Sequence, residues 1–217
     1  MTNDPFLRPG PAGRSLEQAS PYPPPPTNPQ EEPSAGAVRE YDPRWPTQFA
    51  TERALLRELL QPWLTTDIEH VGSTAVPGLP AKPCIDMLAG VADLEQARAA
   101  GEVLRHHGYH YRVHRPEAHL FEKPGVGDWR RHTHHLHLTE PGSDLWNERV
   151  TFRDALRTNA ALTQEYSQWK HAHAAHDADA VDPYDETKWP FVSRVLAQQG
   201  VLLQADRLRL ASPKRTD

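Results

Sequence analysis

The segment from Cys84 to Ala89 is the part of the chain that most narrows the possible folds. Five of its six residues are apolar, and such a run predicts a strand that is buried on both faces of a sheet. Asp86 is the polar exception, and a carboxylate in a buried strand must be paired, protonated or bound to a cation. Asp86 is therefore the first candidate functional residue, whereas Cys84 is expected to be a small core residue.

Helices and short strands are predicted on both sides of this segment. Phe49, Leu56 and Leu60 recur at helical steps, and Pro190 is expected to kink or divide the last helix. In chain order, the predicted elements are a helix over 46–63, strands over 68–71 and 84–89, a helix from 93 to about 107, strands over 109–114, 118–123 and 133–139, and helices over 143–158, 160–176 and 182–199.

Proline divides the chain into a leader and a body. Ten of the 22 prolines fall in residues 1–37, a composition that favours polyproline II and solvated chain over a packed core. We therefore predict a disordered leader over 1–38, one domain over 39–200 and a C-terminal tail over 201–217.

Composition excludes several classes of function. The formal net charge is −5, and the leader holds two basic and four acidic residues, so the body lacks the basic footprint of a nucleic-acid-binding protein. No apolar run is long enough to span a membrane, and no signal peptide is visible. A single cysteine, Cys84, fits a reducing compartment, so we expect a cytoplasmic protein.

A turn rich in small and hydroxyl residues follows the first predicted strand. Gly72 lets the backbone approach a phosphate closely, while Ser73 and Thr74 add hydroxyl donors beside exposed N–H groups, as in a phosphate-binding nest. Lys82 could neutralise Asp86 or contact a phosphate. The alternatives are that the segment is only a turn and that Asp86 only pairs with a neighbour.

Histidines gather in the strand predicted over 133–139. His135 and His137 point to one face, whereas His134 shares the other face with two leucines. Two imidazoles on one strand face can share a cation, and Asp86 is the natural third ligand. The alternative is a polar strand face in a His-rich protein.

Three basic residues of the C-terminal helices, Arg153, Lys170 and Lys188, could line an anion site. Such residues are more often solvated charges or surface pairs. The six tryptophans lie mostly at helical spacing and are expected to pack in the core.

Taken together, these motifs resemble the GrpB-like proteins. The resemblance spans about residues 40–198. Its motifs are Gly72-Ser73-Thr74-Ala75-Val76-Pro77-Gly78-Leu79, Lys82-Pro83, Ile85-Asp86, His134-His135-Leu136-His137, Phe152-Arg153-Asp154, Leu156-Arg157, Tyr166 with Lys170, and Lys188-Trp189-Pro190-Phe191.

The resemblance implies an α+β fold of the nucleotidyltransferase superfamily, with a small mixed sheet flanked by helices and a C-terminal helical segment. GrpB-like domains also occur fused behind dephospho-CoA kinase. No kinase P-loop is present here, so the chain resembles the stand-alone form.

The superfamily pattern that this resemblance implies has Gly-Ser after one strand, two carboxylates on the next strand and a third on a later strand. Gly72, Ser73 and Asp86 match it. Leu88 stands at the second carboxylate position, and His135 or His137 stands in place of the third. Two-metal transfer needs acidic ligands on both ions, so this departure favours a single cation or plain nucleotide binding.

The leading hypothesis from the sequence is a nucleotidyltransferase-like protein that uses a nucleotide and a small-molecule or protein acceptor. Asp86 and His137 are the candidate catalytic residues. A divalent cation, Mg²⁺ by expectation, would be held by Asp86, His135 and His137. The candidate phosphate-binding residues are Gly72, Ser73 and Thr74 of the turn, together with the basic residues Lys82 and Arg153.

Two other functions stay open at the level of the sequence. A catalytically inactive nucleotide- or small-ligand-binding module is favoured by Leu88. A single-metal hydrolase or lyase could use Asp86, His135 and His137. Nucleic acid and membrane are not expected partners, and the oligomeric state is not predicted.

Overall fold

The structure is a computed structural model that describes residues 38–112, 116–125, 128–173 and 183–203. Almost all of the predicted leader, most of the predicted tail and the last residues of the helix predicted over 160–176 lie outside the described residues. The same is true of His114, the last residue of the strand predicted over 109–114.

Five α-helices, two short 3₁₀ helices and five strands form in these residues, in the predicted α+β order. They are α1 (Trp45–Leu60), β1 (Leu64–Val71), η2 (Ser73–Ala75), β2 (Ile85–Val91), η3 (Gln96–Ala99), α2 (Ala100–His106), β3 (His110–Arg112), β4 (Ala118–Gly125), β5 (Asp128–Thr139), α3 (Asp144–Thr158), α4 (Ala160–His173) and α5 (Pro183–Gln198).

The strands form one mixed sheet in the order β1-β2-β5-β4-β3. Only the central pair, β2 with β5, is parallel, whereas the other neighbours are antiparallel. A parallel pair needs a crossover, and the chain from η3 through β4 provides it. The crossover brings the apolar strand β2 beside the His-rich strand β5.

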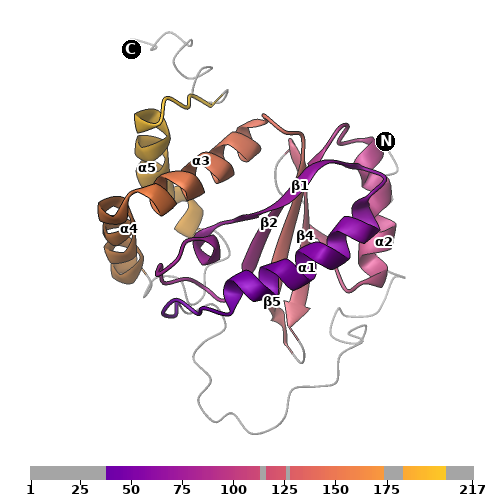
Figure 1. Ribbon diagram of the computed structural model, residues 1–217, viewed down its shortest axis with the longest axis horizontal. Coiled ribbons are helices and arrows are strands. Elements are labelled where there is room, and N and C mark those ends of the chain that lie inside the picture. Colours follow the sequence, from indigo (N-terminus) through magenta and orange to yellow (C-terminus); the bar gives the residue numbers. More distant parts are fainter. Residues whose placement is uncertain (1–37, 113–115, 126–127, 174–182, 204–217) are drawn as a thin grey trace, which may run out of the picture.

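Helices cover both faces of the sheet (Figure 1). The first face packs against α1 and α2 through an apolar core that includes Leu56, Met87, Leu104 and Leu136. The second face packs against α3 at Leu145. In Figure 1, α3, α4 and α5 gather on the left of the sheet and α2 lies on the right. Because helices cover both faces of the sheet, β2 is buried on both sides, as the apolar run over 84–89 predicts.

Several local predictions are corrected by the structure. Cys84 precedes β2 rather than lying within it, and the residue as a whole is partly exposed although its thiol is desolvated. Pro190 lies inside α5 without dividing it. Asp93 accepts a hydrogen bond from the backbone N–H of Gln96, but the helix predicted from 93 begins with a 3₁₀ turn, and α2 starts only at Ala100. Among the described residues, no helix is long and apolar enough to cross a bilayer.

Candidate functional site

Asp86 and His135 lie side by side at the centre of the sheet. They are register partners in the parallel pair β2–β5, and Leu88 is the partner of His137. The Oδ1 atom of Asp86 is 3.1 Å from Nδ1 of His135. Side chains alternate along a strand, so Asp86, His135 and His137 all face the α3 side. The structure therefore brings Asp86 and His135 into contact. His137 lies two residues further along β5, beside Leu88, and belongs to neither group of described residues whose ligand atoms lie within 4.8 Å of one another.

The charges around this pair favour an ionised Asp86. Burial alone would raise the pKa of its carboxyl, but the hydrogen bond from His135 and the charges of His135 and Arg149 hold it far below the usual range. Burial would lower the pKa of His135, and neighbouring Cys84 and Asp86 raise it well above its usual value. Because burial raises the pKa of the Cys84 thiol, that thiol is neutral at pH 7. Asp86 is therefore the group that charges His135.

Gly72 lies directly against the carboxylate of Asp86. Its φ of 70° is a conformation that glycine adopts freely, and a Cβ atom at this position would lie 2.2 Å from Oδ2 of Asp86. Both properties restrict the position to glycine. The predicted Gly-Ser turn and the predicted strand carboxylate are thus in contact, because η2 folds back over the start of β2.

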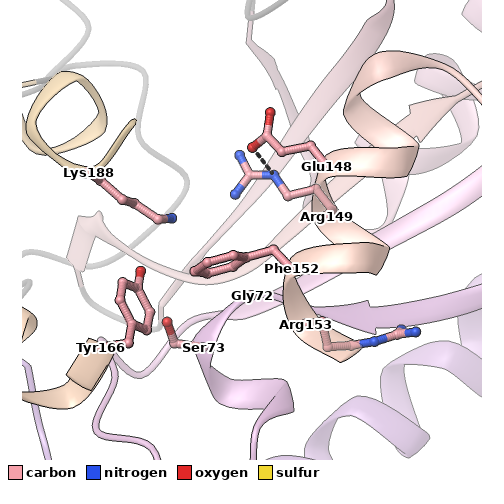
Figure 2. A pocket seen from close by; sticks show the side chains of 8 residues that line it. All are labelled: Gly72, Ser73, Glu148, Arg149, Phe152, Arg153, Tyr166 and Lys188. Carbon is pink, nitrogen blue, oxygen red and sulfur yellow. Dashed lines mark ion pairs between the residues drawn. The ribbon is translucent and has the colours of Figure 1, made fainter. Parts of the chain in front are cut away.

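A narrow pocket opens beside this turn, between Gly72 and Ser73 and the C-terminal helices. Figure 2 shows the side chains of Phe152, Tyr166 and Lys188 converging beside Ser73. Phe152 and Tyr166 meet edge to face at 5.2 Å between ring centroids, and the Lys188 ammonium lies 6.0 Å from the Phe152 ring. Hydroxyl, aromatic and cationic groups of this kind are suited to an anionic ligand with a ring.

Arg149 adds a second positive charge to the pocket. Its Nε atom is 3.7 Å from Oε1 of Glu148, the ion pair drawn in Figure 2. The same charge contributes to the low pKa of Asp86. The pocket has room for about 20 Å³ of water, enough for a single water molecule. A larger ligand would lie across its mouth or require side chains to move.

Thr74, one of the predicted phosphate ligands, is used inside the protein. Its hydroxyl lies 3.0 Å from Nε2 of His70 and 3.3 Å from the Cys84 carbonyl oxygen, and it is almost completely buried. Burial lowers the pKa of His70 to about 4, so this imidazole is neutral at pH 7. Thr74 therefore holds the two ends of the loop together.

Basic residues of α3 and α4 fix the same loop. The buried ammonium of Lys170 donates to the Pro80 carbonyl oxygen at 2.8 Å, and Nε of Arg157 donates to that of Ala75 at 2.9 Å. Lys82 lies in the loop, three residues before β2 begins. Among the basic residues of the C-terminal helices that were predicted to line an anion site, Lys170 therefore has a structural role. Lys188 lines the pocket.

Arg153 also has internal partners. Its guanidinium donates to Glu69 at 2.6 Å, to the His70 carbonyl oxygen at 3.1 Å and to Asp154 at 2.7 Å. Although Arg153 borders the pocket, Figure 2 shows its guanidinium pointing away from the side chains that converge there. These bonds attach α3 to β1, and Arg149, one helical turn earlier, is the better placed cation.

A second group of possible ligands lies beside His135. Glu122 of β4 and His132 of β5 have ligand atoms within 4.8 Å of each other and of His135, and Cys84 with Asp86 forms a similar group around the same imidazole. Burial lowers the pKa of His132.

Sequence reasoning gave no role to Arg149, Glu122 or His132. Arg149 could have been found from its helical spacing, because Arg149, Phe152 and Arg153 lie on one face of α3. Glu122 carried no such signal, and His132 stood in the histidine cluster without a role of its own, since only the strand register brings both to His135.

The fold and the pocket define an α+β protein whose parallel strand pair places a carboxylate and histidines beside a Gly-Ser turn. The chain belongs to the GrpB family, because the family model described as GrpB protein matches residues 36–198.

Individual relatives agree with this assignment. The chain is 34% identical over 160 residues to a UPF0157 protein of Halalkalibacterium halodurans, covering 72% of this chain and 78% of the relative. It is 34% identical over 155 residues to the glutamate-rich protein GrpB of Alkalihalophilus pseudofirmus, covering 70% and 88%. The crystal structure of the conserved protein GrpB from Enterococcus faecalis superposes with a TM-score of 0.66 at 28% identity, covering 76% of this chain and 99% of that one.

Proposed function

We propose that this GrpB-family protein binds a nucleotide at the Gly72–Ser73 turn and transfers its nucleotidyl group to a hydroxyl or amine of an acceptor. The observation that carries the proposal is the contact between Gly72 and the Asp86 carboxylate. A turn that exposes N–H groups and an ionised carboxylate are the two parts that a phosphate and its cation need.

The pocket supplies the remaining interactions. Ser73 and Lys188 would contact phosphate oxygens, and Arg149 takes the role that the sequence assigned to Arg153. Lys82 would add charge from the loop. The attacking acceptor oxygen or nitrogen would form a bond to the α-phosphorus as the bond to pyrophosphate breaks, and the protein would act by position and charge.

The residues of this site suit a single divalent cation. Asp86 offers the carboxylate beside the turn, His135 hydrogen-bonds to its Oδ1 atom, and His137 lies two residues further along the same strand face. Leu88, at the second acidic position, is completely buried in an apolar cluster, so it cannot support a second ion. Bound Mg²⁺, held by Asp86 and the nucleotide's own oxygens, would neutralise phosphate charge.

Leu88 favours a second candidate, a binding module of the same fold without catalysis. It predicts that nucleotide binds but that no pyrophosphate is released with any acceptor. It also predicts that replacing Asp86 leaves affinity unchanged.

Titration calorimetry with the four ribonucleoside triphosphates, with and without Mg²⁺, tests the proposal. We expect wild type to bind at least one nucleotide in a Mg²⁺-dependent manner and Asp86→Ala to bind it at least tenfold more weakly. If wild type shows no metal-dependent binding, the proposed function is wrong.

A pair of glycine variants distinguishes damage to the site from the general effect of backbone strain. Gly72 and Gly78 both have positive φ, but a Cβ atom at Gly78 meets nothing within 4 Å. Both replacements by alanine strain the backbone, and only Gly72→Ala displaces the Asp86 carboxylate. We therefore expect Gly72→Ala to lose nucleotide binding and Gly78→Ala to retain it.

A further inference from the structure

Glu122, His132 and His135 form a cluster, here called the β4–β5 triad, that the proposed function does not use as a unit. Glu122 and His135 are register partners in adjacent strands. His135 Nε2 is 3.3 Å from His132 Nδ1 and 4.0 Å from Glu122 Oε1. The Nε2 atom of His132 lies 3.5 Å from Glu122 Oε2.

These separations are close to those of metal ligands. Two ligand atoms about 2.0–2.1 Å from a tetrahedral zinc ion lie about 3.3 Å apart. The two imidazoles of the β4–β5 triad already have this spacing. Oε1 of Glu122 lies 4.0 Å from Nε2 of His135, so the carboxylate would need to move by roughly 0.7 Å to reach the same spacing.

Asp86 orients His135 toward the β4–β5 triad. An ionised carboxylate only accepts hydrogen bonds, so the Nδ1 atom of His135 must donate to Asp86 across 3.1 Å. Nε2 is then the ring atom that faces His132 and Glu122. Carboxylates that hold the far nitrogen of a ligating histidine in this way are a recurrent part of zinc sites.

We propose that the β4–β5 triad binds a divalent transition metal, zinc before others, with Asp86 as a positioning residue. Two imidazoles and one carboxylate favour zinc over Mg²⁺, which prefers oxygen ligands. Three protein ligands leave the fourth tetrahedral position for water or a small ligand.

Arg112 forms an ion pair with Glu122, so a bound metal would have to compete with this guanidinium. Its NH1 atom is 3.1 Å from Oε1 of Glu122, and its side chain is 45% exposed. It can therefore swing into solvent when Oε1 turns to the metal. The site does not depend on nucleotide binding, so each proposal can fail without the other.

A competing arrangement exists on the opposite side of the His135 ring. Cys84, Asp86 and the same imidazole also have ligand atoms within 4.8 Å of one another. In that arrangement Asp86 would be a ligand and Nδ1 would lose its proton. The β4–β5 triad is favoured because Nδ1 of His135 is already hydrogen-bonded to Asp86 across 3.1 Å, whereas Nε2 lies 3.3 Å from Nδ1 of His132.

Zinc titration of the untagged full chain, with a competing chelator dye, tests the site. We expect wild type to bind one equivalent, and Glu122→Gln and His132→Gln each to bind at least tenfold more weakly. His134→Gln is the matched control, because His134 lies on the same strand but packs on the opposite face, beside Thr133. It should bind as wild type does.

Two further measurements decide between the arrangements. Asp86→Asn should weaken zinc about 10- to 100-fold through its effect on His135, while Cys84→Ser should leave affinity unchanged. The Co²⁺ spectrum of wild type should show tetrahedral bands without a thiolate charge-transfer band, a readout that needs no variant to fold.

The proposal is overturned if wild type binds no zinc at micromolar concentration, or if His134→Gln loses zinc as strongly as His132→Gln does. It is also overturned if a thiolate band appears or if only Cys84→Ser abolishes binding. Mg²⁺-dependent nucleotide binding, measured separately, would survive any of these results.

Discussion

The two faces of the sheet use the same strands for different purposes. On the α1–α2 face, Met87 and Leu136 are completely buried in the main core. One residue away on the α3 face, the side chains of Asp86 and His135 are each 29% exposed and bonded to each other. Because side chains alternate along a strand, successive residues of β2 and β5 serve packing and chemistry in turn.

The largest expected effect comes from removing side-chain volume on the packing face. Leu136→Ala should lower the free energy of unfolding by about 2–5 kcal/mol, since a fully buried leucine loses its contacts and leaves a cavity. Urea unfolding followed by circular dichroism measures the change. Nucleotide and zinc affinity should persist wherever this variant stays folded.

His135→Ala is the matched replacement on the other face. It should change the unfolding free energy much less than Leu136→Ala does, because His135 is partly exposed, yet it should abolish zinc binding. If the two variants lose similar stability, the two faces of the sheet do not differ in their contribution to folding.

Much of the fold follows from periodicity in the sequence. The apolar run of β2, the alternation in β5 and the helical spacing of α1 each identified an element. The missed strand residues are polar: β1 begins at Leu64, ahead of Thr65, Thr66 and Asp67, and β5 begins at Asp128. Thr65, Thr66 and Asp67 lie in the register shift between the paired residues Leu64 and Ile68, and Asp128 pairs with Gly125 at the end of β4. Neither position leaves a hydrophobic pattern to read.

The site was predictable to the extent that a buried polar residue needs a partner. Asp86 stood out for this reason, and His135 was named with it. Their contact depends on the register of two strands separated by a long crossover, which no local pattern encodes. The same limit explains why Glu122 was missed and why Thr74 was expected to face a ligand instead of His70.

The pH dependence of stability is the next effect in size and concerns His70. This imidazole stacks on Phe49 of α1, and burial lowers its pKa from 6.5 to about 4. Between these values the unfolded chain binds a proton that the folded protein excludes, so stability falls as the pH drops. The loss attributable to His70 is about 2 kcal/mol by pH 5.

Denaturant unfolding of wild type and His70→Gln at pH 7.5 and pH 5 isolates this contribution. Other groups titrate in both proteins, so the difference between the two pH-dependent losses is the quantity of interest. Wild type should lose about 2 kcal/mol more than the variant over this range. Parallel pH dependence in the two proteins would mean that His70 is charged in the folded state.

The smallest expected effect tests how firmly α3 holds the pocket over the sheet. Ser143 caps α3 by accepting a hydrogen bond from the Trp146 N–H at 3.2 Å, and its Oγ lies 2.8 Å from Oγ1 of Thr139 at the end of β5. Ser143→Ala should therefore cost about 1 kcal/mol of stability. The helix also carries Arg149 and Phe152, so a loosened first turn should weaken nucleotide binding modestly while zinc affinity at the β4–β5 triad stays constant. Equal losses for both ligands would show that the pocket and the triad are coupled, either along β5 from Thr139 or through Arg149 and Asp86.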